Sequence, residues 1–442
     1  ETDLLTQISP QLDSITNHLK SLVAFDLIHS IESKVFEFSH KLTQQVAYQT
    51  IPGMRRRTIH TQIATEIEAR NKGNIERAYE ELAFHFHNGE KDTRTLDKAI
   101  HYLIAAGDKA KGQYSNQSAL GFYNQALSLI GDKHPPSSNS KHVLRALKGV
   151  GELQLLLGDY EQANHSFSQA LDLAETMLEK VQLKRRLAEV YEQQAEYVAG
   201  IEMLEIALQD LKSISETSQS TRQTIEKARL LNQYGSFYAK RGDFNTAIEK
   251  TTEALNLASA EEIAPDLMAT IDKNLGIYYL RTRNVERGKE YFTKAIELAE
   301  KIGDRVLIAQ LYNNLGVAAQ MTGNTDQSLT YYQKSAEIKE ALGNTHDLTT
   351  SYTNIGLTYS IRQDIEKAFD FYGKAIEMAK RIGAYRQVSF VQRKMATAYW
   401  KQQDFDKAIQ HYQEAQTICE RIGDKEGLNE ALQGLAEAYL AK

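Results

Sequence analysis

Four glycines stand 40 residues apart in the C-terminal half of the chain, and each follows an isoleucine or leucine at the end of a helical pattern: Gly303, Gly343, Gly383 and Gly423. Glycine tolerates the left-handed backbone conformation in which many helices end. A fixed period of this size is typical of repeat proteins, whose units bury their apolar faces against their neighbours. The period therefore predicts a repeat array.

Other columns of the sequence keep the same 40-residue step. Small residues recur at Gly276, Gly316, Gly356, Ala396 and Ala436. Eight positions after the small residue come Asn284, Asn324, Asp364 and Asp404. Asn and Asp directly before an apolar run cap the first turn of a helix, because their side-chain oxygens accept unpaired backbone N–H groups. Each unit is therefore predicted to be a helix, a turn, a second helix and a glycine.

Aromatic and alanine columns complete the pattern. Tyr279, Tyr359 and Tyr399 follow the small residue by three positions, and Ala295, Ala375 and Ala415 form a later column. This pattern resembles the tetratricopeptide repeat, in the long-helix variant of spindle-orientation adaptors. Earlier units fit with looser spacing, and their first small column is Gly107, Gly151, Ala188 and Gly235. The resemblance implies an all-α fold, a right-handed α-solenoid of about eight helix pairs.

Residues 36–68 do not share the period and carry a different set of motif residues. These are Phe38, His40, Leu42, Gln45, Val46, Ala47, Tyr48, Arg56, Arg57, His60, Ile63, Ala64 and Glu66. The segment resembles the end of the winged-helix part of multidomain signalling ATPases, above all those fused to class III adenylate or guanylate cyclases. Related junctions also occur in ATPases fused to histidine kinases or to DNA-binding domains.

Three parts of the chain are therefore expected. Residues 1–70 would be the C-terminal part of a winged-helix-like linker domain, a small helical remnant before the array. Residues 71–140 would be transitional helical pairs, and residues 141–442 the tetratricopeptide superhelix with a terminal capping helix whose packed face holds Leu432, Leu435, Ala436 and Tyr439. Flexible joints are predicted at 131–142 and 212–224, where polar residues interrupt the periodicity.

Composition and missing motifs limit the function classes. The 442 residues have a net charge of −6, 25% charged residues and a single cysteine, Cys419, which favours a reducing, cytoplasmic compartment. No apolar stretch is long enough for a membrane helix. No G-x-x-x-x-G-K-[ST] phosphate loop and no nucleophile with an oriented base occur, so the sequence predicts no enzyme and no cofactor.

Two polar clusters invite sharper interpretations. His85 and His87, with His101 nearby, could suggest a metal, but residues two apart on a helix point to different sides, so ordinary packing is favoured and no metal is expected. Arg55, Arg56 and Arg57 could contact phosphate or nucleic acid. A run of three on an acidic chain is more often a solvated or ion-paired face, and no nucleic-acid partner is expected.

The face of each first helix that turns away from its partner is the candidate site. If the small residue is position 8, positions 2, 5, 6, 9, 12 and 13 cluster opposite the packed side and line the concave surface of a solenoid. We call this the groove face. Its predicted peptide-binding residues are Arg229, Asn232, Lys240, Lys273, Asn274, Arg281, Asn313, Asn314, Val317, Met321, Asn354, Leu357, Ile361, Arg393, Lys394, Trp400 and Lys401.

Chemistry of these positions suggests the kind of partner. Asn274, Asn314 and Asn354 share position 6, where asparagine is also used by peptide-binding tetratricopeptide proteins, which this face resembles. Amides can clamp a peptide backbone without reading its sequence, although they could instead satisfy neighbouring helices. The basic residues predict acidic flanks on the ligand. An apolar centre is predicted from Val317, Met321, Leu357, Ile361 and Trp400.

Two functions remain open at this point. The chain could be a protein-binding regulatory module of a signalling ATPase or cyclase, with a ligand that is another protein or a segment of the same protein. It could instead be a free-standing scaffold or an immune-type sensor that recognises a foreign protein.

Overall fold

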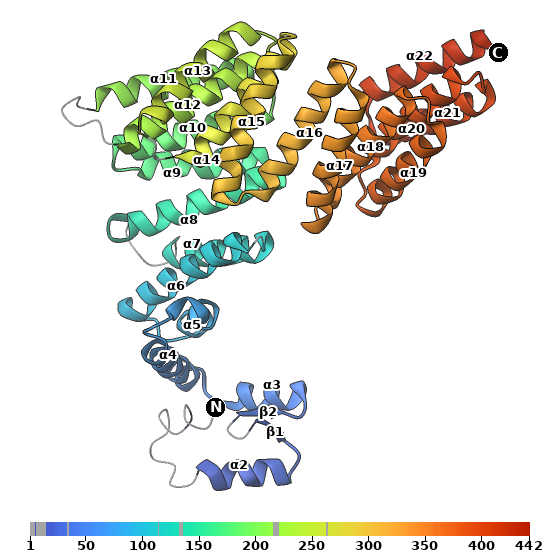
Figure 1. The fold of residues 1–442 in the computed structure, drawn as a ribbon. Coiled ribbons are helices and arrows are strands. Elements are labelled where there is room, and N and C mark those ends of the chain that lie inside the picture. The colour runs from blue at the N-terminus through green and yellow to red at the C-terminus, as the bar shows by residue number, and fades with distance from the viewer. Residues whose placement is uncertain are drawn as a thin grey trace. The chain divides into compact units, whose positions relative to one another are not determined.

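The computed structural model describes Leu5 and residues 15–32, 35–113, 115–131, 136–214, 221–261 and 264–442 (Figure 1). The chain forms two compact units, residues 1–210 and 211–442. In chain order, the helices of the described residues form eight pairs, from α6 with α7 to α20 with α21, and α22 follows them. The predicted all-α solenoid of about eight helix pairs is confirmed.

Unit 1 contains the only sheet among the described residues. Strands β1 (Ile28–Glu32) and β2 (Val35–Phe38) form an antiparallel hairpin in which Ile28 pairs with Phe38. Helix α2 (Ile15–Ala24) precedes the hairpin, and α3 (Lys41–Thr50) follows it. The unit continues with α4 (Gly53–Arg70), the 3₁₀ helix η1 (Ile75–Ala78), α5 (Tyr79–His87), α6 (Thr93–Gly112), α7 (Asn116–Gly131), α8 (Pro136–Leu157), α9 (Tyr160–Leu173), α10 (Met177–Gln193) and α11 (Tyr197–Ser213).

Unit 2 is regular. Its helices are α12 (Thr221–Lys240), α13 (Phe244–Glu261), α14 (Pro265–Arg281), α15 (Val285–Ile302), α16 (Arg305–Met321), α17 (Thr325–Ala341), α18 (Thr345–Ile361), α19 (Ile365–Arg381), α20 (Tyr385–Lys401), α21 (Phe405–Ile422) and α22 (Lys425–Ala441). From α14 to α21, the first and second helices of each pair alternate with the predicted period.

One packing contact recurs in both units. In most pairs the small residue at position 8 lies against an aromatic ring 16 residues later on the second helix, whereas Gly235 meets Thr251 at this place. A Cβ atom on Gly316 would lie 2.5 Å from the ring of Tyr332, and one on Gly151 would lie 2.7 Å from Phe167. Both rings are fully buried. Glycine at this position therefore lets the two helices approach closely.

Helix ends follow the predicted columns. Gly303, Gly343, Gly383 and Gly423 have φ between 67° and 73°, the left-handed conformation that the period predicted. The side chains of Asn324, Asp364 and Asp404 accept backbone N–H bonds at the starts of α17, α19 and α21. Asn284 occupies the same place on α15 without a side-chain bond.

The predicted packed face of the last helix is right at Leu435 and wrong at its other three residues. Helix α22 packs against α20 and α21 through Ala431, Gly434, Leu435 and Ala438. Leu432, Ala436 and Tyr439 are exposed. In the other pairs, position 8 packs against the second helix of the same pair. Among the described residues no such helix follows Ala436, so α22 buries only the side that meets the preceding pair.

Part of each predicted joint lies outside the described residues. Of the predicted joints, residues 132–135 and 215–220 lie outside the described residues, while α8 already begins at Pro136. Within the described part of the chain, no helix has the length and apolar character needed to cross a bilayer, and no group of three potential metal-ligating side chains occurs.

Candidate functional site

On the groove face of unit 2, amides from neighbouring first helices bond to one another. Asn274 Nδ2 donates to Asn232 Oδ1 at 3.0 Å and so joins α14 to α12. Asn354 Nδ2 donates to Asn313 Oδ1 at 3.0 Å and joins α18 to α16. These four residues therefore satisfy neighbouring helices, as the simpler interpretation of the sequence expected.

The amides keep hydrogen-bonding capacity after these bonds. An asparagine side chain offers two donors and two acceptor lone pairs, and each bond uses one of them per residue. Asn314, at position 6 of α16, makes no side-chain hydrogen bond with the described residues and is half-buried. The amide of Asn314 is thus unused, one residue after the bonded Asn313.

The basic side chains of this face differ in exposure and in their contacts. Arg281 and Lys401 are exposed at the ends of α14 and α20. Lys273 is half-buried, donates to Gln310 Oε1 at 3.3 Å, and has its pKa lowered by burial. Arg229 lies 3.8 Å from the buried carboxylate of Glu226. Lys394 stacks 4.8 Å from the centre of the Phe390 ring, and Lys240 is exposed.

Arg393 corrects the sequence prediction. It is only 7% exposed, its Nε bonds to Glu430 Oε2 at 3.1 Å, and its Nη1 lies 3.7 Å from Cys419 Sγ. The sequence pattern could not show this, because Glu430 is contributed by the following helix, α22. Arg393 therefore joins α20 to α22 and is not a groove cation.

The apolar residues predicted for the groove face also differ in exposure. Met321, Ile361 and Trp400 are 48%, 47% and 38% exposed, which is high for large apolar side chains. Val317 packs against the core and Leu357 is half-buried. The exposed three stand at positions 12 and 13, near the C-terminal ends of α16, α18 and α20.

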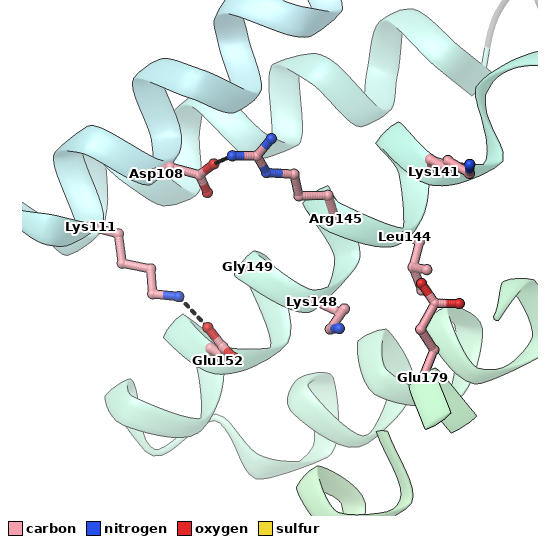
Figure 2. A pocket seen from close by; sticks show the side chains of 9 residues that line it. All are labelled: Asp108, Lys111, Lys141, Leu144, Arg145, Lys148, Gly149, Glu152 and Glu179. Atoms are coloured by element: carbon pink, nitrogen blue, oxygen red, sulfur yellow. Dashed lines mark hydrogen bonds and ion pairs between the residues drawn. The ribbon is translucent and has the colours of Figure 1, made fainter. Parts of the chain in front are cut away.

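Unit 1 has a cavity on the equivalent face, which the sequence analysis did not find. Positions 9 and 12 of α6, and 2, 5, 6 and 9 of α8, line a space of about 360 Å³ (Figure 2). The lining residues are Asp108, Lys111, Lys141, Leu144, Arg145, Lys148, Gly149, Glu152 and Glu179. The shared position numbers were the signal that could have found it.

The acids of this cavity already have partners. Asp108 pairs with Arg145 and accepts from Tyr123 Oη at 2.5 Å. Glu152 pairs with Lys111 and with Arg186 Nη2 at 3.1 Å. Burial raises the pKa of Glu152, but its bond to Lys111 and the charge of Arg186 outweigh burial and lower the pKa overall.

Two lysines of the cavity, Lys141 and Lys148, form no ion pair with the carboxylates of the described residues. Glu179 is engaged in the capping box with Thr176 at the start of α10. The charge of Lys148 contributes to lowering the pKa of Glu152 and Glu179, yet Lys148 and Lys141 form no ion pair among the described residues. Figure 2 shows both lysines beside the space, away from the two paired groups. The cavity can therefore accept an anionic group.

Family comparison agrees with the repeat architecture. The tetratricopeptide repeat model matches residues 267–341, 307–381 and 387–442, and the Sel1 repeat model matches residues 76–110. Comparison with curated proteins gives no match. Residues 267–442 are therefore a tetratricopeptide-repeat array.

Solved structures share the fold at low sequence identity. A Rap protein complexed with competence and sporulation factor has a TM-score of 0.50 and 13% identity, covering 77% of this chain and 97% of that one. The apo quorum sensor NprR from B. thuringiensis has a TM-score of 0.55 and 14% identity, covering 85% and 98%. These similarities concern the fold alone.

A signal transduction ATPase with numerous domains and a tetratricopeptide repeat sensor, from Pyrococcus horikoshii, is similar over a longer stretch. Its TM-score is 0.53 at 14% identity, and the match covers 99% of this chain and 60% of that protein. At this identity the match concerns the fold alone. It says nothing of a cyclase, so the predicted cyclase fusion stays a prediction.

Proposed function

We propose that this chain is a protein-interaction module whose groove face binds an extended peptide or a protein segment. The observation that carries the proposal is the amide row of unit 2, where Asn314 is unbonded beside amides that keep spare donors and acceptors. Such groups gain little in a packing face but can bond to a peptide backbone.

The surroundings of the amides support a ligand with an apolar centre. Met321, Ile361 and Trp400 expose apolar area on the same face, near the C-terminal ends of α16, α18 and α20. Arg281 and Lys401 add positive charge at the edge of the face and favour acidic flanks. The cavity of unit 1, with Lys141 and Lys148, is a second place on the groove face that favours an acidic group.

In the longer protein that we envisage, occupancy of the groove would regulate upstream ATPase or cyclase domains. Residues 1–70 would then be the end of a winged-helix-like linker, residues 71–140 a transition, and residues 141–442 the cytoplasmic sensor array, closed by α22 as a capping helix. We expect this chain itself to catalyse no reaction. The Rap protein was solved in complex with a factor, which supports ligand binding as a use of the fold.

A free-standing scaffold or immune-type sensor is the second candidate. It uses the same groove, but its ligand would be a foreign protein, and no ATPase would precede the array. The two candidates differ in one measurable property. A regulatory module changes the nucleotide hydrolysis of its own full-length protein when the groove is occupied, and a scaffold does not.

The groove is tested with a fluorescent synthetic peptide that has a leucine-rich centre and acidic flanks, and with a second peptide whose flanks are lysines. We expect the acidic peptide to bind more tightly. Asn314→Ala should weaken binding about fivefold to tenfold, the value of one or two backbone hydrogen bonds. Asn314→Ala with Asn354→Ala should weaken it further.

Matched controls separate binding from folding. Glu297→Ala changes an exposed position on the second helix α15 and should leave the affinity unchanged. Circular dichroism melting shows whether Asn354→Ala, which also breaks the bond to Asn313, loosens the contact between the first helices α16 and α18. Equal affinity of the wild type and the double variant, at equal melting temperature, would show that the groove model is wrong.

A further inference from the structure

A cavity outside the groove face brings together residues from the two polar clusters of the N-terminal sequence. It has a volume of about 520 Å³ and lies between α3, α4 and α5 of unit 1. Arg56 comes from the arginine run, and His85 from the histidine pair. The repeat period does not reach this region, and the proposed peptide groove makes no use of it.

Three side chains that line the cavity form a chain of hydrogen bonds. Tyr48 Oη lies 2.9 Å from His60 Nε2, and His60 Nδ1 lies 2.9 Å from His85 Nδ1. Both ring nitrogens of His60 are therefore engaged, and the imidazole cannot turn without breaking a bond. Burial lowers the pKa of His60, and the charge of Arg56 lowers it further. Burial and the neighbouring His60 lower the pKa of His85 to about 4. At neutral pH both imidazoles are uncharged.

The walls are mainly apolar. Ile51 comes from the loop between α3 and α4, Ile59 and Ile63 from α4, and Phe84 from α5. Phe84 is 57% exposed, which makes it a partly open wall. A volume of several hundred Å³ with apolar walls and a few convergent polar atoms is the usual form of a small-molecule site.

Arg56 supplies the one formal charge of the lining. Its guanidinium lies 5.0 Å from the centre of the Tyr48 ring, and no carboxylate of the described residues lies within ion-pair distance of it. Arg55 and Arg57 on the same turn are exposed, whereas Arg56 is half-buried against the cavity. A cation beside an apolar space favours a ligand with an apolar body and one acidic group.

We propose that this cavity binds a small amphiphilic anion, a molecule whose apolar body fills the space between Ile59, Ile63 and Phe84 and whose single acidic group pairs with Arg56. The site does not depend on the peptide groove. Its position next to α4 and α5 places it in the segment that leads from the hairpin into the helix pairs, so bound ligand would stiffen that junction.

The probe for this site is 8-anilinonaphthalene-1-sulfonate, which has an apolar body and one sulfonate. We expect the wild-type chain to bind it with enhanced fluorescence. Arg56→Gln should weaken the binding about tenfold, the value of a charge-assisted hydrogen bond. Arg55→Gln is the matched control, because it removes the same charge one residue away on an exposed position, and it should change the affinity less than twofold.

Two further variants are designed to fill the cavity. Ile51→Trp adds a large side chain from the loop and should abolish the saturable site, and Ile63→Trp does the same from α4. Circular dichroism shows which of the two variants keeps its fold. Full probe binding by a variant that keeps its fold would overturn the proposal. The dye would then lie outside the cavity, for example on Leu42 and Val46 of α3, which are 69% and 53% exposed.

Competition separates charge from apolarity. Decanoate should displace the dye from wild type about tenfold more effectively than decanol, and this difference should vanish in Arg56→Gln. Equal displacement by decanoate and decanol from the wild type would show that Arg56 does not recognise the acidic group, which contradicts the proposal.

Discussion

The two units use the same contact between small residue and ring but join their neighbouring first helices differently. In unit 1 the links across the groove face are ion pairs, such as Lys111 with Glu152 and Arg145 with Asp108. In unit 2 they are mostly neutral, such as Asn313 with Asn354. Ion pairs use up the charge that a ligand would need, whereas amide pairs leave donors and acceptors over. Packing therefore specifies the array, and the polar links between first helices decide what the groove face can bind.

The shared packing rule gives the largest expected effect. Gly316→Leu in unit 2 and Gly151→Leu in unit 1 each push a side chain into a buried ring, and each should lower the free energy of unfolding by about 3 kcal/mol or more. Urea denaturation followed by circular dichroism measures both. A much smaller loss in one unit would break the claim that both units pack by one rule.

Controls for these variants exist in both units. Gly373 and Gly121 are helical, and a Cβ on either meets nothing within 4 Å. Gly373→Ala and Gly121→Ala should therefore raise the stability by about 0.5–1 kcal/mol through helix propensity.

Unit 2 also contains a buried carboxyl group, although the links between its first helices are mostly neutral. Asp272 is 3% exposed, its Oδ1 has no hydrogen-bond partner among the described residues, and burial raises its pKa to about 7, against a smaller opposing effect of Lys294. The same position of the next two pairs carries Tyr312 and Tyr352.

The sign of the Asp272 effect follows from this raised pKa. The folded state holds the proton between pH 4 and 7, where the unfolded chain has lost it, so stability falls as pH rises through this window. Asp272→Asn should stabilise unit 2 by about 2–3 kcal/mol at pH 8 and by almost nothing at pH 4. Thermal unfolding of both proteins across this range is the measurement. A gain that is independent of pH would mean that the carboxyl is not held protonated.

Histidines give unit 1 the opposite dependence on pH. His85 has a folded pKa of about 4, below its ordinary value of 6.5, because burial and the neighbouring His60 disfavour its charged form. The unfolded chain binds the proton first, so stability is lost as pH falls from 6.5 towards 4. Because His85 is half-buried, we expect a loss of about 1 kcal/mol between pH 7 and pH 5.

The His85 contribution can be isolated by substitution. His85→Phe should remove this part of the pH dependence, and hydrogen exchange in α4 and α5 should report it. Acid sensitivity that the Phe variant keeps in full would assign it to other groups, such as His60 or His101.

The sequence predicted the parts of the structure that depend on residue identity at a fixed step. The glycine ends, three of the four second-helix caps and the small column up to Ala396 were predicted in this way. The site was predicted less well. Arg393 is buried by Glu430 of another helix, and the cavity of unit 1 forms where the spacing is irregular.

A second set of helix ends was missed for a related reason. The first helices also end in left-handed residues, but glycine fills only some of these positions: Gly323 has φ of 74°, whereas Arg283, Gln363 and Gln403 have φ of 62–63°. A left-handed helix end that different residue types occupy cannot be recognised from residue identity alone. The caps of the first helices, Asp304, Asn344 and Asp424, were also passed over, because they directly follow the glycines that end the preceding helices.

Substitutions at these left-handed helix ends should change the stability least. Gln403→Gly should stabilise unit 2 by about 0.5–1 kcal/mol, because a non-glycine residue is strained at positive φ. Gly303→Ala should destabilise it by a similar amount at the end of α15, although a Cβ there meets nothing. Chemical denaturation of the two single variants and their combination should show effects of opposite sign that add, because the two sites lie on different pairs. In unit 1, Ala195, with φ of 60°, offers the same test, and Ala195→Gly should also stabilise. If Gln403→Gly destabilises instead, helix-end strain is not what separates the two sets of ends, and side-chain contacts of Gln403 must outweigh it.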